Sequence, residues 1–531
     1  EEEGVDFLHK LRGMFALALY DRRSERLILA RDRLGQKPLY YTLRDGELIF
    51  ASEIKAIHES GLVDKALDPE SLPAYLSFGF VPGPRTLFTG VFKLAPGEVL
   101  VHSRGEARKT RYWRPPAAAN ADESFDSATR RVRELLEEAV ALRLMSEVPL
   151  GVFLSGGIDS SAVLGLMRQV SDARPRTFSV GFEDGRLDEL DYARRVAEHF
   201  GSEHHEVIVR GCTLEQLETM NWHQDEPLGD PAAVPTFRLS EYARRRITVA
   251  LTGEGGDETF AGYDHHQLCR RMEAADIAVP GMRWLARGAR LGEGLVAPWL
   301  TPTLRKGAWI ASLHPSARMA AWTSAFTDRE IERLLRRKPV FSVEDAAADQ
   351  PELADGGSLS RVLYWDLSST LADHLLMKVD KMSMAHSLEA RSPLVDHELV
   401  EYVARLPLKL KISARGSKPI LREAVKDLVP REILERPKHG FDVPVRRWLA
   451  GSLSSFVDSV VLSDRSPVAD YLEPNVVRAL FASMRRTPKP RTELQCWRIL
   501  NLVVWHELHW PARCATSVQR SDEPLVGSVA G

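Results

Sequence analysis

Cysteine and long apolar runs are both scarce in this sequence. Only four of its 531 residues are cysteine, and none stands in a Cys-x-x-Cys pair. A disulfide framework is therefore not indicated, and a reducing compartment is the simpler expectation. No apolar run approaches the ~20 residues that a membrane-spanning helix needs. We therefore expect a cytoplasmic protein without a membrane partner.

Charge of one sign is lacking as well. Lysine plus arginine total 71 and aspartate plus glutamate total 74, which gives a formal net charge of −3. Nothing in this balance argues for nucleic acid as the main partner. Hydrophobic residues make up 44% of the chain and charged residues 27%, which excludes a mainly disordered chain, a collagen and a coiled coil. The length is typical of several domain-sized units.

The N-terminus lacks an initiator methionine and a signal peptide. The chain opens on Glu1-Glu2-Glu3-Gly4 instead of a basic and then apolar segment. We expect that this sequence begins inside a longer protein.

The first hundred residues have the pattern of short β-strands. Apolar runs at 15–20 and 26–30 are separated by a charged turn, and 39–42 and 47–50 flank Asp45-Gly46, which suits a hairpin turn. A proline- and alanine-rich segment follows. We predict one domain over 1–112 and a linker over 113–125.

The pattern then changes to strands that alternate with helices. We expect strands at 148–154, 177–182, 206–209 and 247–251, and helices at 132–144, from 158, at 190–200 and at 236–246. This alternation predicts an α/β domain with a parallel, doubly wound sheet over 126–515, with extra helices toward its C-terminus. Residues 516–531 are predicted to be a disordered tail.

A glycine- and serine-rich loop, Leu154-Ser155-Gly156-Gly157-Ile158-Asp159-Ser160-Ser161, follows the first of these strands and opens a helix. Ligands bind at this edge of an open parallel sheet. The two glycines allow a phosphate to approach the backbone N–H groups, and the helix N-terminus favours its charge. Asp159 suits a phosphate only if Mg²⁺ bridges the two. The loop lacks the Gly-Lys-Ser/Thr ending of a Walker A motif, and an ordinary strand-to-helix turn is the alternative.

Three further segments carry chemistry-bearing residues. Thr252-Gly253-Glu254-Gly255-Gly256-Asp257-Glu258 follows another strand, where carboxylates could hold a metal or form only a solvated turn. The others are 378–396 and the basic turn Arg436-Pro437-Lys438-His439-Gly440-Phe441. A lysine here could stabilise a phosphoryl transition state, although composition alone favours a surface loop.

Together and in this order, the four segments resemble the glutamine-hydrolysing asparagine synthetases, from about Asp6 to His509. The resemblance implies a domain of the ATP-pyrophosphatase (adenine nucleotide alpha hydrolase-like) type, which adenylates aspartate with ATP and Mg²⁺ and lets ammonia displace AMP. It also implies a role for each matching residue. The phosphates would be held by Ser155, Gly156, Gly157, Asp159 and Ser160, and the nucleoside by Leu154, Val180, Thr252 and Gly253. Magnesium would be bound by Asp159 and Asp257, Glu254 would lie near the acyl-adenylate, and Lys438 would stabilise the transition state.

The first domain resembles the second half of the family's glutaminase domain, an Ntn-type α+β sandwich, through 31–41 and 50–56. The family's nucleophile is an N-terminal cysteine, whereas the first cysteine here is Cys212. We therefore expect no glutaminase nucleophile in this chain, and glutamine use only by a longer protein. A homodimer is compatible with the resemblance.

Several alternatives stay open. β-Lactam synthetases, lasso-peptide cyclases and amidotransferases of biosynthetic clusters share the architecture and activate other carboxylates. ATP pyrophosphatases of GMP or NAD synthesis share only the Ser-Gly-Gly-x-Asp-Ser loop. A scaffold with a vestigial nucleotide site would be expected to have lost Asp159, Asp257 or Lys438, and all three are present.

Overall fold

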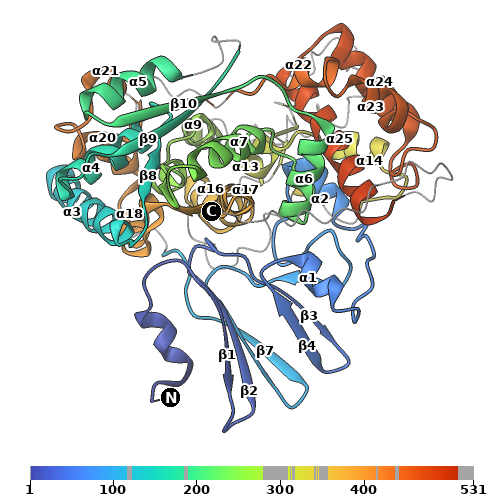
Figure 1. Ribbon diagram of the computed structural model, residues 1–531, viewed down its shortest axis with the longest axis horizontal. Coiled ribbons are helices and arrows are strands. Elements are labelled where there is room, and N and C mark those ends of the chain that lie inside the picture. Colours follow the sequence, from blue (N-terminus) through green and yellow to red (C-terminus); the bar gives the residue numbers. More distant parts are fainter. Residues whose placement is uncertain are drawn as a thin grey trace, which may run out of the picture.

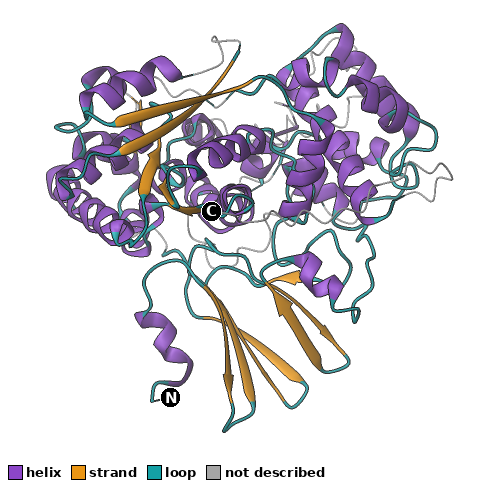
Figure 2. Cartoon of the chain, in the orientation of Figure 1, coloured by secondary structure: helices purple, strands orange, loops and turns teal. Residues whose placement is uncertain are grey.

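A strand-rich N-terminal part lies against a larger, helix-rich part (Figures 1 and 2). The computed structural model describes residues 2–116, 122–183, 189–278, 317–339, 357–413, 416–436 and 442–511, with isolated positions at 306, 309–310, 312–313, 342–343, 345 and 440. The described residues do not include Lys438, residues 117–121 of the predicted linker, or the predicted tail over 516–531. Among the described residues, no helix is long and apolar enough to cross a membrane.

The N-terminal part contains two antiparallel sheets. One has the order β1 (Ala16–Asp21), β2 (Arg26–Arg31), β6 (Glu98–Ser103), β7 (Glu106–Arg111), and the other the order β4 (Glu47–Ala51), β3 (Tyr40–Arg44), β5 (Phe92–Lys93). The predicted hairpin is confirmed as β3–β4, and Asp45 and Gly46 both have positive φ, 51° and 81°. Such φ values give a turn whose twist matches that of the paired strands. Leu29, Tyr41 and Leu100 pack together in a core that both sheets share.

The larger part is built on a parallel sheet of five strands. Their order is β10 (Glu203–Val209), β9 (Arg176–Phe182), β8 (Leu150–Phe153), β11 (Val249–Leu251), β12 (Glu389–Arg391). Each neighbouring pair is parallel, which confirms the predicted sheet. The first four strands were expected from the apolar runs, whereas β12 is an unpredicted edge strand of three residues.

Helices cover both faces of this sheet because the side chains of a strand alternate between its faces. Val152 of β8 belongs to a core that it shares with α3 (Phe125–Leu144), α4 (Ile158–Val170) and α5 (Leu190–His199). Its neighbour Phe153 packs on the other side, in a core with Phe178 and with Leu239 of α7 (Ala233–Arg244). α17 (Leu376–Met384) then packs against α7.

A helical layer around α25 (Pro490–His509) completes the molecule (Figure 1). Trp497 and Trp505 of α25 are fully buried and belong to the core of this layer. The neighbours of α25 include α6 (Leu214–Gln224), α22 (Val445–Ala450), α24 (Pro474–Arg486) and α2 (Leu72–Phe78) of the N-terminal part.

Further helices are η1 (Gly4–Lys10), α1 (Ile54–Glu59), α8 (Gly256–Phe260), α9 (Asp264–Ala278), α13 (Arg318–Thr323), α14 (Asp328–Leu334), α16 (Ser358–Trp365), the π-helical η4 (Asp366–Leu375), η5 (Pro393–Val395), α18 (His397–Arg405), α19 (Leu408–Lys411), α20 (Pro419–Ala424), α21 (Arg431–Glu435), α23 (Ser454–Phe456) and η6 (Val457–Val461). Two-residue strands β13 (Ile412–Ser413) and β14 (Gly416–Ser417) pair before α20.

Candidate active site

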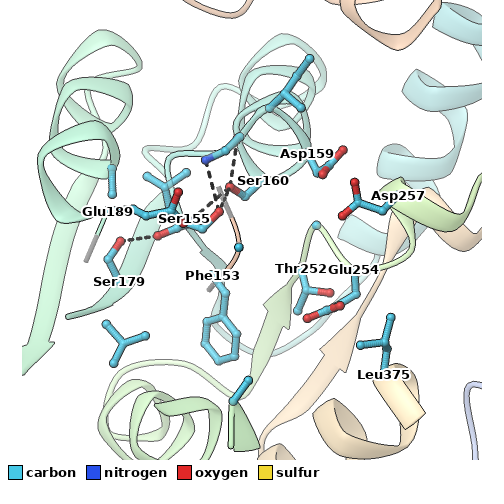
Figure 3. Close-up of a pocket in the computed structure, with 18 of the residues that line it drawn as sticks. Phe153, Ser155, Asp159, Ser160, Ser179, Glu189, Thr252, Glu254, Asp257 and Leu375 are labelled. Carbon is cyan, nitrogen blue, oxygen red and sulfur yellow. Dashed lines mark hydrogen bonds between the residues drawn. The ribbon is translucent and has the colours of Figure 1, made fainter. Parts of the chain in front are cut away.

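The site lies where the strand order of the parallel sheet reverses. From β8 the chain continues to β9 and β10 on one side, and β11 then pairs with the other side of β8. Loops that leave two such strands diverge and open a crevice at their carboxyl ends. A pocket of about 480 Å³ occupies this position, which is within the size range of small-molecule sites. Figure 3 shows its lining.

The loop after β8 is held in shape by its own serines. The Ser155 N–H donates to Ser160 Oγ at 3.2 Å, and the Gly157 N–H donates to Ser155 Oγ, also at 3.2 Å. Gly156 has a φ of 75°, and a Cβ there would lie 2.6 Å from the backbone nitrogen of Ala193. Only glycine therefore fits this turn. The loop ends at Gly157, the N-cap of α4, and the N-terminus of a helix favours an anion.

The loop after β11 packs directly against the loop after β8. A Cβ at Gly253 would lie 2.7 Å from the backbone nitrogen of Ser160, closer than side-chain carbons come. Glycine at 253 thus lets the two loops share one pocket. Asp159 from the first loop and Asp257 from the second point toward one another in Figure 3.

Lys418 bridges these two carboxylates. Its Nζ lies 2.7 Å from Asp159 Oδ1, 2.6 Å from Asp159 Oδ2 and 2.7 Å from Asp257 Oδ1. Burial by itself would lower the pKa of this lysine, but the two carboxylates outweigh burial and raise the pKa above its ordinary value. Lys418 is therefore a fixed positive charge between the two acids for which a metal was predicted.

Glu254 and Lys378 form a second charged group in the lining of the pocket. Burial, with help from the charges of Asp230 and Asp257, raises the pKa of Glu254, although Lys378 acts in the opposite direction. Lys378 Nζ lies 2.9 Å from Asp230 Oδ2. Burial disfavours its charge, but Asp230 and Glu254 keep its pKa above the usual value. The pocket thus offers a carboxyl group with raised proton affinity beside an ion pair.

Arg436 closes the side of the pocket near the first loop. Its guanidinium pairs with Glu189, lies 3.9 Å from the ring centroid of Tyr192, and donates to the Gly156 carbonyl at 3.4 Å. These three partners, a carboxylate, an aromatic face and a carbonyl, fix the orientation of the guanidinium group. Arg436 also begins the predicted basic turn, whose Lys438 lies outside the described residues.

Nearly all the described residues predicted for the site line this one pocket. They are Leu154, Ser155, Gly157, Asp159, Ser160, Val180, Thr252, Gly253, Glu254 and Asp257. Gly156 instead sets the turn of the loop through its positive φ. Lys418, Asp230 and Lys378 also line the pocket, and the sequence predicted no role for them. Lys378 begins one of the four segments of the family resemblance, whereas nothing in the local sequence marked the other two.

A buried polar chain lies behind Asp257. Burial and the charges of Asp257 and Asp366 raise the pKa of Glu258 to about 8, and Glu258 accepts a hydrogen bond from the hydroxyl of Tyr263. His265, His266 and Asp366 form the one group of His, Cys, Asp and Glu in the described part of the chain whose spacing would suit a metal. His266 Nδ1, however, accepts from the Tyr263 N–H while Nε2 lies 2.7 Å from Asp366 Oδ2. Both ring nitrogens are therefore engaged within the protein, and we assign no metal to this group.

Buried lysine–carboxylate pairs join the N-terminal part to the α/β part. Asp225 Oδ1 lies 3.0 Å from Lys55 Nζ, and Asp225 Oδ2 lies 2.8 Å from Lys381 Nζ. Lys381 is one helical turn from Lys378 on α17, so the same helix contacts the domain boundary and the pocket. Two similar pairs are Lys37–Asp380 and Lys93–Glu226.

The parallel sheet, the Ser-Gly-Gly-x-Asp-Ser loop and the pocket at the strand reversal define an α/β nucleotide-binding enzyme of the ATP-pyrophosphatase type. Comparison with known protein families identifies the family within this class. Residues 131–507 match the asparagine synthase family, and residues 1–113 match the glutamine amidotransferase domain. The chain belongs to the asparagine synthase family, as the motifs predicted.

Curated relatives include proteins of two kinds. Asparagine synthetase [glutamine-hydrolyzing] 1 of Bacillus subtilis is 31% identical over 94% of this chain and 78% of its own length. A putative asparagine synthetase [glutamine-hydrolyzing] of Mycobacterium bovis is 32% identical over 95% of this chain and 78% of its own length. The amidase chry2 of Gibberella zeae is 29% identical over 86% of this chain and 73% of its own length.

Proposed function

We propose that this protein converts the side-chain carboxylate of aspartate into an amide at the expense of ATP, with ammonia as the nitrogen donor. A carboxylate oxygen attacks the α-phosphorus of ATP, and pyrophosphate leaves with the electrons of the broken P–O bond. Ammonia then attacks the acyl carbon, and AMP leaves with the former carboxylate oxygen. The observation that carries the proposal is the single pocket in which the phosphate loop, Glu254 and the Asp230–Lys378 pair meet.

The phosphate end of the pocket supplies positive charge. The N–H groups of the loop after β8 and of the first turn of α4 would bind the phosphates, and Lys418 and Arg436 would offset the charge that develops on pyrophosphate. Lys438 remains a prediction for the same role. Leu154, Val180 and Thr252 would bind the nucleoside.

Magnesium is a proposed cofactor, and the side chains fit it. Asp159 and Asp257 are hard oxygen ligands on two facing loops, and they already hold a cation, the ammonium group of Lys418. When bound, the ion would neutralise phosphate charge and make pyrophosphate a better leaving group.

Glu254 would act on the acyl-adenylate. A carboxyl group whose pKa is raised is a stronger base than an ordinary glutamate, so Glu254 can take the proton that the attacking nitrogen loses. In a longer form of the protein that carries the nucleophilic cysteine, glutamine would supply the ammonia.

The second candidate is amidation of a different carboxylate, which the fungal amidase relative favours. Both candidates share the acyl-adenylate step, so they differ only in the acid. The test is pyrophosphate release from ATP and Mg²⁺ with aspartate, glutamate, succinate or no acid, each with ammonium. Release that requires aspartate supports asparagine formation. Release with another acid but not aspartate supports the second candidate, and release that needs no acid contradicts both.

A further inference from the structure

One cationic side chain in the lining of the active-site pocket has no acid partner. The described residues of the lining include four cationic side chains: Lys378, Lys418, Arg422 and Arg436. Three of them are paired with carboxylates: Lys378 with Asp230, Arg436 with Glu189, and Lys418 with both Asp159 and Asp257. Arg422 is half-buried and forms no ion pair within the part of the chain that the structure describes. Such a cation is stabilised when an anion binds beside it.

Arg422 lies at the phosphate end of the pocket. It follows Lys418 by one helical turn, and its backbone N–H donates to the Lys418 carbonyl at 3.0 Å. Residues at this spacing are neighbours on a helix surface, so the two side chains lie next to one another. The Nε of Arg422 donates at 2.9 Å to the carbonyl of Ser417, another residue of the lining. The guanidinium group therefore lies on the same side of the pocket as the Lys418–Asp159 pair.

Burial and the charge of Asp159 act on Arg422 in opposite directions. Burial lowers the pKa of the guanidinium group and outweighs Asp159, which raises it. An arginine side chain nevertheless stays protonated in proteins. Arg422 is therefore a permanent positive charge, and Asp159 offsets the cost of its burial only in part. A bound anion would offset the remainder.

The remaining hydrogen-bond donors of Arg422 suit a phosphate group. Its Nε is used by the Ser417 carbonyl, whereas Nη1 and Nη2 donate no hydrogen bond within the described residues. These nitrogens belong to a planar fork that can bind two oxygens of one phosphate. The ammonium group of Lys418, by contrast, already donates to Asp159 and lies 2.7 Å from Asp257. Arg422 thus has free donors where its neighbour has few.

We propose that Arg422 binds the terminal phosphates of ATP and holds the pyrophosphate group as it leaves. Negative charge grows on these oxygens when the bond to the α-phosphorus breaks, so the contact strengthens in the transition state and lowers the barrier to adenylation. AMP keeps the α-phosphate and does not need Arg422. This inference rests on the proposed function, and it assigns a binding role to a residue for which the sequence predicted none.

The test compares the binding of pyrophosphate and of AMP to Arg422→Gln by calorimetry in the presence of Mg²⁺. We expect pyrophosphate to bind about 10- to 100-fold more weakly than to the unmodified protein, whereas AMP binds equally well. Lys426→Gln is the matched control because Lys426 is 62% exposed and pairs with Glu423, and it should bind both ligands normally. An unchanged affinity for pyrophosphate, or equal losses for pyrophosphate and AMP, would overturn the proposal.

A second variant tests the charge and the fork of Arg422 separately. Arg422→Lys keeps the charge without the planar fork, so its affinity for pyrophosphate should lie between those of the unmodified protein and Arg422→Gln. Equal affinities of the two variants would contradict a role for the charge. Should Arg422→Gln not fold, Arg422→Lys still decides, because it should weaken the binding of pyrophosphate and leave that of AMP unchanged.

The same ligands distinguish a failure of this inference from a failure of the proposed function. Neither pyrophosphate nor AMP needs an acid substrate in order to bind. An unmodified protein that binds both, but releases no pyrophosphate from ATP with any acid, would contradict the proposed reaction. The assignment of Arg422 depends instead on the affinities of the variants, and an unmodified protein that does not bind pyrophosphate would overturn it.

Discussion

Lys418 and Asp159 form a two-pronged ion pair in the phosphate end of the pocket, with Nζ 2.7 Å from Oδ1 and 2.6 Å from Oδ2. The backbone of Lys418 has a φ of 54°, a left-handed conformation that costs a non-glycine residue energy. This backbone conformation therefore persists because the surrounding structure imposes it. Lys418 stands just before α20, so its ammonium group lies where the phosphates and their metal are proposed to bind.

Replacement of Lys418 should affect both catalysis and stability. In Lys418→Met, Asp159 and Asp257 face one another without a cation, and pyrophosphate loses a stabilising charge. We expect acid-dependent pyrophosphate release to fall about 100-fold or more, and the thermal midpoint to fall without Mg²⁺ and to recover partly with it. Lys409→Met, at an exposed position of α19, is the control. Near-normal activity of Lys418→Met would contradict the assigned role.

Glycine 253 should tolerate no side chain, because the two loops of the pocket touch there. In Gly253→Ala the new Cβ would press on the Ser160 nitrogen and push the loop of Asp257 away from the loop of Asp159. ATP binding, measured by calorimetry, should weaken about tenfold or more. Gly211→Ala meets nothing within 4 Å and should bind ATP normally. Equal affinities of the two variants would show that the loops need not be in contact.

The boundary between the two parts should be stabilised by Lys381. Asp225 is 1% exposed, and its two lysine partners outweigh burial and keep its pKa below the usual value. Removal of one partner in Lys381→Met leaves a buried charge half-compensated and should lower the free energy of unfolding by about 2–4 kcal/mol. Lys65→Met breaks an exposed pair and should cost at most about 1 kcal/mol. Urea denaturation checks both values, and equal costs would contradict the account.

Glu258 should make the protein less stable as the pH rises. Burial and nearby carboxylates raise its pKa from 4.5 to about 8 in the folded state. Between these pH values the folded protein holds a proton that the unfolded chain has released, so the free energy of unfolding falls as pH increases. Glu258→Gln removes this dependence. Its stability relative to the unmodified protein should therefore rise steadily from pH 5 to pH 8, as denaturation at each pH would show.

The control for Glu258 is Glu215→Gln at an exposed position of α6. Its difference from the unmodified protein should be the same at every pH. A pH-independent difference for Glu258→Gln as well would mean that Glu258 is ionised normally in the folded state.

Local patterns in the sequence predicted most of the α/β architecture. Apolar runs separated by amphipathic segments located β8, β9, β10 and β11, and the glycines of the two loops marked the edge of the sheet that binds ligands. Strand β12 was missed because three residues, Glu389–Arg391, carry no recognisable period. Its pairing with β11 depends on contacts that are distant in the chain.

The charged groups of the site were predicted less completely, for the same reason. Lys418 is 259 residues from Asp159, and no spacing rule links them. Asp230 is likewise 148 residues from its partner Lys378, and the two meet only through the packing of α17 against the segment after α6. The role of Lys438 remains a prediction from the family resemblance, since this residue lies outside the described part of the chain.

The central claim is that an acyl-adenylate forms in this pocket, and an oxygen label tests it most directly. Aspartate with ¹⁸O in its side-chain carboxylate should be incubated with the protein, ATP, Mg²⁺ and ammonium, and the nucleotide products examined by mass spectrometry. The account predicts one labelled oxygen in AMP and none in pyrophosphate. Label in inorganic phosphate, with ADP as the nucleotide product, would show that an acyl phosphate forms instead and would contradict it.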